Sequence, residues 1–293
     1  MRKGPVMSEK EILVVSFGTS FAEARKTDIG GIEEALARAY PDYRIARAFS
    51  SPRVIRHMQR EDQEQVDSVS QALEGALAAG IKQLILQPTY LMHGIEYELM
   101  IRILSGYRDR FASVAVGQPL LGETDQNPAH YTEDMVRVSR ALLENAWKEA
   151  GLLNREPGQD PVDKADKGPA LVLMGHGTEH GAHIVYQQFQ SLFSDQGRKD
   201  VFVATVDGDC PETDIHNILS EVQREGFKHV ILRPLMVVAG DHANNDMAGD
   251  REDSWKNLFA ATGSFEEIEC QLGGLGRLEK IQQIYVDHAA AVM

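Results

Sequence analysis

Apolar residues occur along this chain in two patterns, as short continuous runs and as residues that recur at helical spacing. Residues 12–16 form a nearly continuous apolar run, which is typical of a strand buried on both faces of a sheet. Between residues 66 and 77, apolar side chains lie three or four positions apart, which predicts a helix with one buried face. The same patterns predict strands at 43–48, 84–86, 114–116, 170–174, 201–206 and 230–232. They also predict one helix that begins near residue 22 or 27, and three further helices at 135–143, 215–222 and 281–292.

This alternation of strands and helices indicates the fold class. Strands that alternate with helices form βαβ units, and such units build parallel sheets covered by helices. We therefore expect an α/β protein of two similar, duplicated half-domains. Each half has a parallel sheet flanked by helices, and the active-site cleft lies between the halves.

The segment 151–169 interrupts the pattern near the middle of the chain. It combines glycine and proline residues with charges and holds few apolar side chains, which is typical of a linker or loop. We expect an N-terminal half at 8–150, a linker at 151–169 and a C-terminal half at 170–293. The last helix is expected to be able to pack back on the first half.

An internal repeat supports the two halves. Residues 80–88 and 226–234 align at one constant offset, with glycine, lysine and proline at matching places. The same offset aligns Glu96 with His242, each two residues after a glycine. Such self-similarity is the signature of a duplicated structure. We therefore expect two similar half-domains that face each other, with Glu96 and His242 at matching places and both directed into one cleft.

A second repeat brings in another candidate side chain. Residues 16–19, Ser-Phe-Gly-Thr, match residues 175–178, Gly-His-Gly-Thr, directly after the first strand of each half. Ligands of open α/β sheets bind at the carboxyl ends of the strands, and glycine lets the backbone approach them closely. His176 is therefore the third candidate, beside Glu96 and His242. His180 and His183 follow His176 at helical spacing, so they are either supporting groups around the site or polar residues at a helix start, and we favour the second interpretation.

These candidates suit a metal ion. Two imidazoles and a carboxylate are a common donor set for divalent first-row metals. A neutral imidazole can also accept a proton near neutral pH. The set therefore indicates metal chemistry, acid–base chemistry, or both.

Composition and charge exclude several classes. The chain is 43% hydrophobic and 25% charged, as in globular proteins, and no apolar run is long enough to cross a membrane. The net charge of −14 argues against nonspecific binding of nucleic acid. Four arginines lie close together between residues 44 and 56; they are either solvated surface charges or a local patch for an anionic substrate.

Other sequence features limit which cofactors and which cellular compartment we expect. The two cysteines form neither a disulfide framework nor a CxxC site, and no secretory signal is evident, which favours the cytoplasm. The sequence has no Walker A motif, and the glycines of residues 273–276 lack the context of a dinucleotide loop. We therefore expect no nucleotide cofactor.

Several segments resemble one known family. They are residues 14–20, 175–177, 235–247 and 253–256, together with 47–49, 96–98 and 273–276. They are similar to the anaerobic, ATP-independent cobalt chelatases of vitamin B12 synthesis. These class II chelatases insert cobalt into sirohydrochlorin, and the resemblance runs from about residue 11 to 290. It implies two α/β halves with a tetrapyrrole cleft between them, Co²⁺ as substrate metal, and no organic cofactor or ATP.

The resemblance also implies the ligands. The family's metal site uses two histidines and a glutamate, which correspond to His176, His242 and Glu96. Ile95 departs from the family, which often has an acidic residue there, and His93 stands where an uncharged residue is expected. The 151–169 segment is also longer than usual. These departures affect metal preference and the polarity of the pocket.

A mechanism follows as a hypothesis. The metal ligands leave open positions toward the ring, His176 accepts a pyrrole proton, and His242 is a metal ligand or second base. Forked hydrogen bonds from arginine suit the carboxylates of the substrate. The candidate substrate-binding residues are Ser16, Phe17, Arg47, Arg53, His93 and Arg233.

Alternatives keep the fold and change the activity. Fe²⁺ and Ni²⁺ share this donor set, so an iron or nickel chelatase fits as well. A non-catalytic carrier would bind a tetrapyrrole or metal without turnover. A bilobal small-molecule receptor would normally be exported, and the missing secretory signal argues against this alternative. The expected partners are sirohydrochlorin and a divalent metal, without nucleic acid or membrane, and the chain could form a homo-oligomer.

Overall fold

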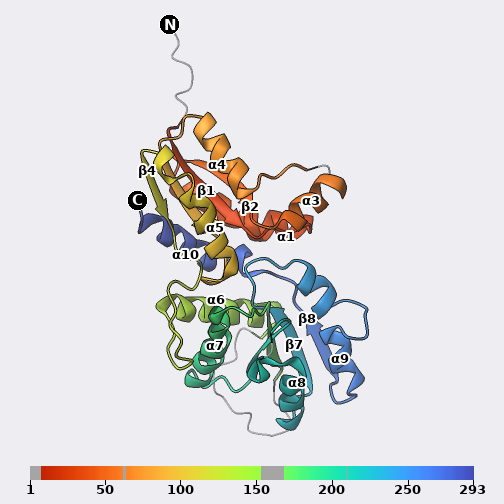
Figure 1. Ribbon diagram of the computed structural model, residues 1–293. Helices are drawn as coiled ribbons and strands as arrows, with labels where there is room; N and C mark the ends of the chain where they lie inside the picture. Colours follow the sequence, from red (N-terminus) through yellow and green to blue (C-terminus); the bar gives the residue numbers. More distant parts are fainter. Residues whose placement is uncertain (1–7, 62–63, 153–167, 209) are drawn as a thin grey trace. The chain divides into compact units, whose positions relative to one another are not determined.

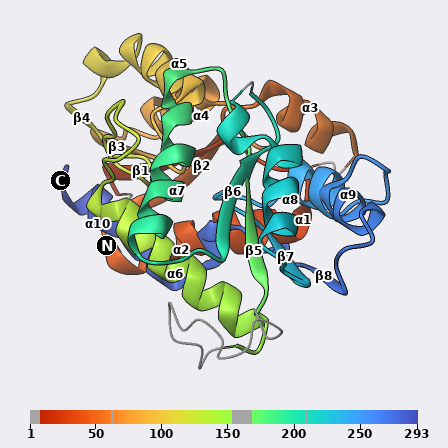
Figure 2. The same ribbon diagram turned by 90° about the horizontal axis from the view of Figure 1, so that it is seen from below.

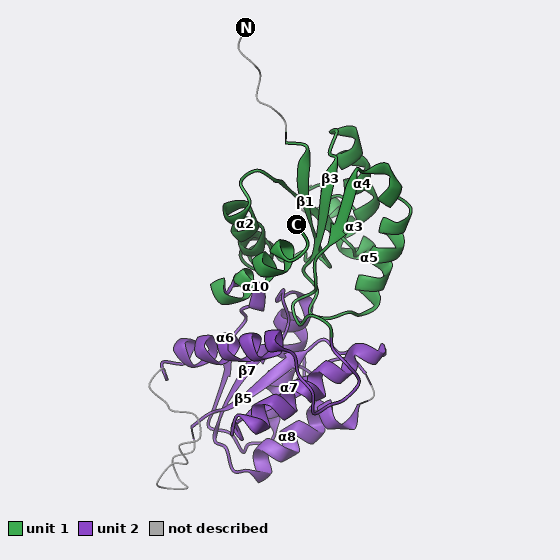
Figure 3. Cartoon of the chain, turned by 90° about the vertical axis from the view of Figure 1, so that its left-hand side faces the viewer, with its two compact units in different colours: residues 1–123, 279–293 green, residues 124–278 purple. Residues whose placement is uncertain are grey.

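The computed structural model describes residues 8–61, 64–152, 168–208 and 210–293 (Figure 1). Contacts divide the chain into two compact units (Figure 3). Unit 1 comprises Met1–Glu123 and Glu279–Met293, and unit 2 comprises Thr124–Leu278. Most of the segment expected to be a linker, 153–167, lies outside the described residues.

Unit 1 is built around a four-stranded parallel sheet in the order β2-β1-β3-β4. The strands are β1 (Lys10–Ser16), β2 (Arg44–Phe49), β3 (Gln83–Pro88) and β4 (Ser113–Val116). The helices are α1 (Ala22–Ala24), the π-helical η1 (Arg25–Ile29), α2 (Gly30–Ala39), α3 (Pro52–Glu61), α4 (Val69–Ala78), α5 (Ile95–Ser105), η2 (Arg108–Arg110) and α10 (Glu279–Ala290). One apolar cluster joins strands β1 and β3 to helices α4 and α5.

Unit 2 repeats this plan with a parallel sheet in the order β6-β5-β7-β8. Its strands are β5 (Ala170–Gly175), β6 (Val201–Thr205), β7 (His229–Pro234) and β8 (Glu267–Cys270). Its helices are α6 (Glu133–Glu149), η4 (Gly181–His183), α7 (Ile184–Asp195), η5 (Pro211–Thr213), α8 (Ile215–Arg224), the π-helical η6 (His242–Met247), α9 (Trp255–Ala261) and η7 (Leu275–Arg277). A second apolar cluster joins strands β5, β6 and β7 to helices α8 and α9.

The duplicated α/β fold predicted from the repeat is confirmed by these two sheets of identical strand order. Helices α4 and α8 begin with the side-chain caps Ser68 and Asp214, and Gly80 and Gly226 follow the helix ends with φ of +77° and +79°. A Cβ at either glycine would meet nothing within 4 Å, so the left-handed backbone is what requires glycine. The same local chemistry therefore builds the same helix–turn–strand unit twice.

The unit boundaries differ from the expected halves at helices α6 and α10. Helix α10 packs against α2, and Tyr40 Oη donates a 2.7 Å hydrogen bond to the carbonyl of Val286. Helix α6 packs against α7 in unit 2 (Figure 2). Gln271 holds α6 by a 3.0 Å bond from Nε2 to the carbonyl of Ala146. The last helix thus belongs to the first unit, and α6 to the second.

Some elements were not predicted. Strand β8 reads Glu-Ile-Glu-Cys, and helices α3, α5 and α9 cover segments for which no helix was expected. The helix start expected at His180 and His183 is present, because η4 and α7 begin there. Strand β8 lies at the edge of its sheet, where a short run with exposed charges is tolerated. Among the described residues, none of the helices combines the length and the apolar character that a membrane span requires.

Candidate metal centre

The turn that carries His176 has no room for a side chain at either of its two glycines. Gly175 ends strand β5, and a Cβ there would lie 2.2 Å from the ring of Tyr186. Gly177 has φ of +85°, and its Cβ would lie 1.8 Å from the carbonyl oxygen of Asp207. The Gly177 amide donates to Tyr186 Oη at 3.1 Å. The two glycines therefore let the chain turn sharply and place His176 at the carboxyl end of β5.

His242 is the first residue of the π-helix η6. Its Nδ1 atom lies 2.6 Å from Oδ2 of Asp246, one turn further along. A carboxylate accepts, so Nδ1 carries the proton and Nε2 keeps its lone pair. Arg251 lies near the other carboxylate oxygen, with 3.8 Å between Nη1 and Oδ1 of Asp246. This arrangement is the usual one for a histidine whose second nitrogen binds a metal.

The two histidines predicted from the sequence lie together in unit 2. Their ring centroids are 4.5 Å apart with 45° between the planes. Asp207 joins them: one donor atom from each of the three residues lies within 4.8 Å of the others. The sequence analysis missed Asp207. The signal was present, because Asp207 follows strand β6 as His176 follows β5, and these strands pair in register from Leu171 to Gly175.

Glu96 lies in unit 1, at the second position of helix α5. Gly94 caps this helix without a side chain, and Oε2 of Glu96 lies 3.9 Å from where a Cβ of Gly94 would be. Strand β3 precedes Glu96 and β7 precedes His242, and these are equivalent strands of the two sheets. Glu96 and His242 thus follow equivalent strands of their own units, in agreement with the repeat. That Glu96 shares a metal with the histidines stays a prediction.

His93 is held within unit 1 by two contacts. Its Nδ1 atom lies 3.1 Å from the carbonyl oxygen of Gly122, and its ring packs edge-on to Tyr97 with centroids 4.3 Å apart. Burial lowers the pKa of His93, and the bond to Gly122 opposes this effect. Because a carbonyl oxygen can only accept, Nδ1 is the nitrogen that donates to Gly122.

The first repeat of the turn, at the end of β1, presents an aromatic ring. Phe17 occupies the place of His176 and is 43% exposed. Ser16 is buried, and its Oγ lies 2.5 Å from Oγ1 of Thr89. Gly18 has φ of +96°, and a Cβ there would meet the ring of Phe49 at 2.5 Å. Ser16 thus shapes the turn, whereas Phe17 is available for contact.

The three candidate arginines have different surroundings. Arg47 binds Glu33 through Nε and Nη2, at 2.6 and 2.5 Å. Arg53 lies exposed on helix α3. Arg233 is fully buried in unit 2. Its guanidinium donates to Glu149, Gln271 and Asn145.

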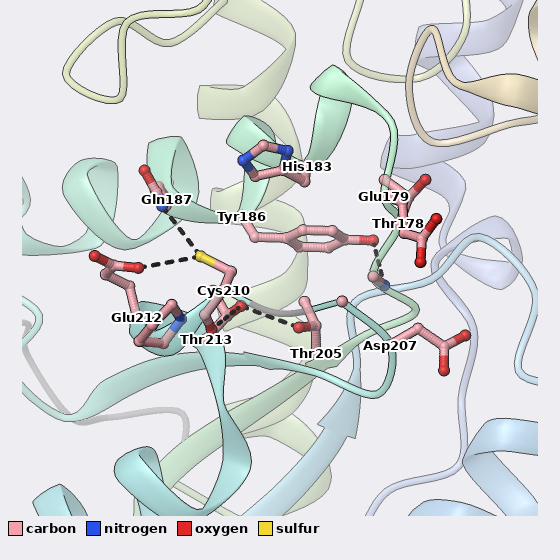
Figure 4. A pocket seen from close by; sticks show the side chains of 13 residues that line it. Thr178, Glu179, His183, Tyr186, Gln187, Thr205, Asp207, Cys210, Glu212 and Thr213 are labelled. Atoms are coloured by element: carbon pink, nitrogen blue, oxygen red, sulfur yellow. Dashed lines mark hydrogen bonds between the residues drawn. The ribbon is translucent and has the colours of Figure 1, made fainter.

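A cavity of about 470 Å³ adjoins the candidate metal centre within unit 2 (Figure 4). Gly177, Tyr186 and Asp207 line it together with Cys210, whose thiol contacts Gln187 and Glu212 at 3.2 Å each. In Figure 4 the carboxylate of Asp207 points away from Cys210. The Asp207 backbone therefore borders the cavity while its carboxylate belongs with the histidines.

Comparison with known proteins finds a matching family model and two similar proteins of known name. The family model described as "Cobalt chelatase (CbiK)" matches residues 10–293. The sirohydrochlorin cobaltochelatase of Salmonella typhimurium is 34% identical over 280 residues, covering 96% of this chain and 95% of that protein. The sirohydrochlorin cobaltochelatase CbiKC of Nitratidesulfovibrio vulgaris is 30% identical over 293 residues, covering 98% and 92%.

Solved structures share the fold at low sequence identity. SirB from Bacillus subtilis with Fe³⁺ superposes with a TM-score of 0.56 at 14% identity, covering 96% of this chain and 94% of that one. The CbiX structure described as the terminal enzyme for siroheme biosynthesis in denitrifying bacteria gives 0.51 at 15% identity, covering 97% and 100%. These structures show the shared fold, whereas the match over residues 10–293 and the two cobaltochelatase relatives show that the chain belongs to the cobalt chelatase (CbiK) family.

Proposed function

We propose that this protein is a sirohydrochlorin cobaltochelatase, which inserts Co²⁺ into sirohydrochlorin in anaerobic cobalamin biosynthesis. The observation that carries the proposal is the pair His176 and His242, with ring centroids 4.5 Å apart at the carboxyl side of a parallel sheet. Two relatives named for this activity align over nearly the whole chain. The proposal therefore joins a site of suitable donors to a family of matching chemistry.

Co²⁺ is a substrate of this reaction, and its ligands are His176 and His242, joined by Glu96. The support for Glu96 is its place after β3, which repeats the place of His242 after β7. Imidazole suits divalent cobalt, and a carboxylate adds charge to the site. Because the protein supplies only a few ligands, the metal keeps open coordination positions. The ring nitrogens need these positions in order to bind the metal.

His176 is the group that we assign to proton transfer. Metal insertion must remove the pyrrole N–H protons of the ring, and a neutral imidazole is a suitable acceptor. His176 is 47% exposed, so its ring can reach a bound substrate and pass the proton to water. His242 acts as a ligand, because Asp246 holds its Nδ1 atom and leaves Nε2 for the metal.

The substrate carboxylates need cations, and we assign this role first to Arg53. Its place on the exposed side of helix α3 supports the assignment. Arg47 would have to exchange Glu33 for a substrate carboxylate. Arg233 is assigned to structure, because three side chains hold its buried guanidinium. Phe17 offers an exposed ring that can pack on the macrocycle. His93, in the same unit as Phe17, remains a candidate for substrate binding.

The reaction as proposed uses neither ATP nor an organic cofactor. Binding of the polyanionic ring supplies the free energy that bends it and aligns its nitrogens with the metal. We place the reaction in the cytoplasm. The free thiols of Cys210 and Cys270 support a reducing compartment.

The test is anaerobic absorbance of the purified protein with sirohydrochlorin and Co²⁺. We expect a shift of the ring spectrum over many turnovers, and a loss of about 100-fold or more in rate for His176→Ala. His216→Ala is the matched control, because His216 lies exposed on helix α8. A shift that stops at one equivalent per protein would indicate a carrier. Repeating the assay with Fe²⁺ and Ni²⁺ ranks the metals.

A further inference from the structure

We propose that the chain contains a hinge at Glu123 and Thr124, where it first crosses from unit 1 to unit 2. Two buried glutamines, Gln87 in unit 1 and Gln188 in unit 2, hold the chain on either side of the crossing and confine bending to these two residues. The hinge goes beyond the proposed function, and only the identity of the ligand that closes it rests on that function.

On the unit 1 side, Gln87 of strand β3 holds the chain that leads to the crossing. Gln87 is fully buried, and its Nε2 atom donates to the carbonyl of Gln118 at 2.9 Å. Gly117 permits this approach, because a Cβ there would lie 2.1 Å from Oε1 of Gln87. Further along, the amide of Leu121 donates to the carbonyl of Leu91 at 3.0 Å. Pairing with unit 1 therefore continues almost to the crossing.

On the unit 2 side, Gln188 of helix α7 repeats this arrangement. It is 1% exposed, and its Nε2 atom donates to the carbonyls of Asp125 and Asn127, at 3.0 Å each. The carboxylate of Asp125 accepts from the amide of Asn127 at 2.8 Å, which closes a turn. Oε1 of Gln188, like Oε1 of Gln87, has no hydrogen-bond partner among the described residues. Burial of an unpaired oxygen costs free energy, so the stabilising contribution of each amide comes from its Nε2 donor.

Between these two anchors, Glu123 and Thr124 are held weakly. Among the described residues, no backbone–backbone hydrogen bond involves either of them. Glu123 is exposed, and Nε2 of Gln118 lies 3.4 Å from its Oε1 atom, which is long for a hydrogen bond. Hinges are a few loop residues that absorb changes in φ and ψ while the segments on both sides keep their structure. The two residues between the glutamines fit this description.

The second crossing is also short. Leu278 ends unit 2, and its amide donates to the carbonyl of Leu275 at 3.0 Å. Helix α10 begins at the next residue and belongs to unit 1. His288 of this helix donates to the carbonyl of Gln118 at 3.1 Å, and the same carbonyl accepts from Gln87. Two short hinges define a line, so rotation about that line is the motion that the two connections allow.

This rotation has a use in the proposed function. Glu96 belongs to unit 1, whereas His176 and His242 belong to unit 2, so rotation at the hinge changes the distance between them. A ligand that contacts both units favours one position of the hinge through its difference in affinity for the two states. Sirohydrochlorin is that ligand here, and closure on the ring excludes water from the reaction.

The first experiment is hydrogen–deuterium exchange of the ligand-free, full-length protein, followed by mass spectrometry of overlapping peptides. In the wild type, the amides of 123–124 should exchange at least about tenfold faster than that of Leu121. Gln188→Leu should speed exchange across 125–127 by about tenfold, because the bonds that hold this turn are lost. Gln190→Leu is the matched control, since Gln190 lies on the same helix but donates to a carbonyl of strand β6.

The second experiment is small-angle X-ray scattering with and without metal-free sirohydrochlorin, on variants that circular dichroism shows to be folded. The radius of gyration should fall when the ring binds. Without the ring it should be larger in Gln188→Leu than in the wild type or Gln190→Leu.

Three results would overturn the hinge. They are slow exchange at 123–124 in the free wild type, wild-type exchange across 125–127 in Gln188→Leu, and ring binding without a change in the radius of gyration. If the absorbance of the ring shows that it does not bind, the proposed function fails. The exchange of the ligand-free protein then decides the hinge by itself.

Discussion

In the second unit, Asp246 accepts a hydrogen bond from His242, with 2.6 Å between Oδ2 and Nδ1. The bond closes one turn of the π-helix η6, which places the two side chains on the same side. It leaves Nε2 as the nitrogen of His242 that could bind a metal. A residue that was never a candidate ligand therefore decides how a predicted one acts.

Replacing Asp246 with asparagine tests this positioning role. An amide can donate to Nδ1 and stabilise the wrong tautomer, so we expect Co²⁺ affinity to fall by about 10- to 100-fold. The d–d spectrum of the bound metal should keep its shape, because the ligands are unchanged. Co²⁺ calorimetry and absorbance measure both. Asp250→Asn, at a nearby exposed position, is the control, and an equal loss in both variants would contradict the role.

The tight turn at Gly177 should be sensitive to a single methyl group. Gly177→Ala places a Cβ 1.8 Å from the Asp207 carbonyl at φ of +85°. We expect a loss of about 3 kcal/mol or more in the free energy of unfolding, measured by urea denaturation. Gly263→Ala is the control, since Gly263 has φ of +64° but open space around it. There the loss should be about 1 kcal/mol. Equal losses would mean that backbone conformation alone matters.

Arg233 should matter for stability and hardly at all for substrate affinity. Its guanidinium is buried and bridges β7 to helix α6 through Glu149 and Asn145. Arg233→Ala should lower the free energy of unfolding by about 3 kcal/mol. In variant protein that remains folded, the KM for sirohydrochlorin should be unchanged. A raised KM at unchanged stability would return Arg233 to the substrate site.

Arg53 should behave in the opposite way. It is exposed on helix α3, so Arg53→Ala should change the free energy of unfolding by less than about 0.5 kcal/mol. Loss of a cation that binds a substrate carboxylate should raise KM by about tenfold, and the effect should shrink at high salt. Steady-state kinetics at two ionic strengths measure this. Arg60→Ala, on the same helix and also exposed, is the control.

His93 should make stability depend on pH. Burial lowers its pKa in the folded protein, whereas the unfolded chain has the ordinary value of about 6.5. The unfolded state therefore binds more protons at mildly acid pH. The stabilisation is present above about pH 6.5 and is lost as the pH falls through the lower folded value. Unfolding measured at pH 7.5 and 5.5 should show a smaller difference in His93→Asn. An unchanged difference would exclude His93 as the source.

The alternation of strands and helices, the duplication and the two histidines could all be predicted from the sequence. Their causes are local. Apolar runs and helical spacing decide which segments are buried, and glycines such as Gly80 and Gly226 are needed where the backbone turns left-handed. His176 and His242 could be found because each follows such a local signal, a buried strand with a glycine beside it. The repeat then related His242 to Glu96 before any contact was known.

Pairing between distant segments decided the rest. Asp207 lies beside His176 because β6 pairs in parallel with β5. The sequence shows that Asp207 follows a strand, but it does not show which strand lies next to β5. The same reason assigns helix α6 to the second unit and helix α10 to the first. It also buries Arg233 among Glu149, Asn145 and Gln271, which are far from it in sequence. Sequence pattern thus determines which elements form, whereas packing between them determines which side chains meet, because hydrophobic burial fixes the partners only in three dimensions.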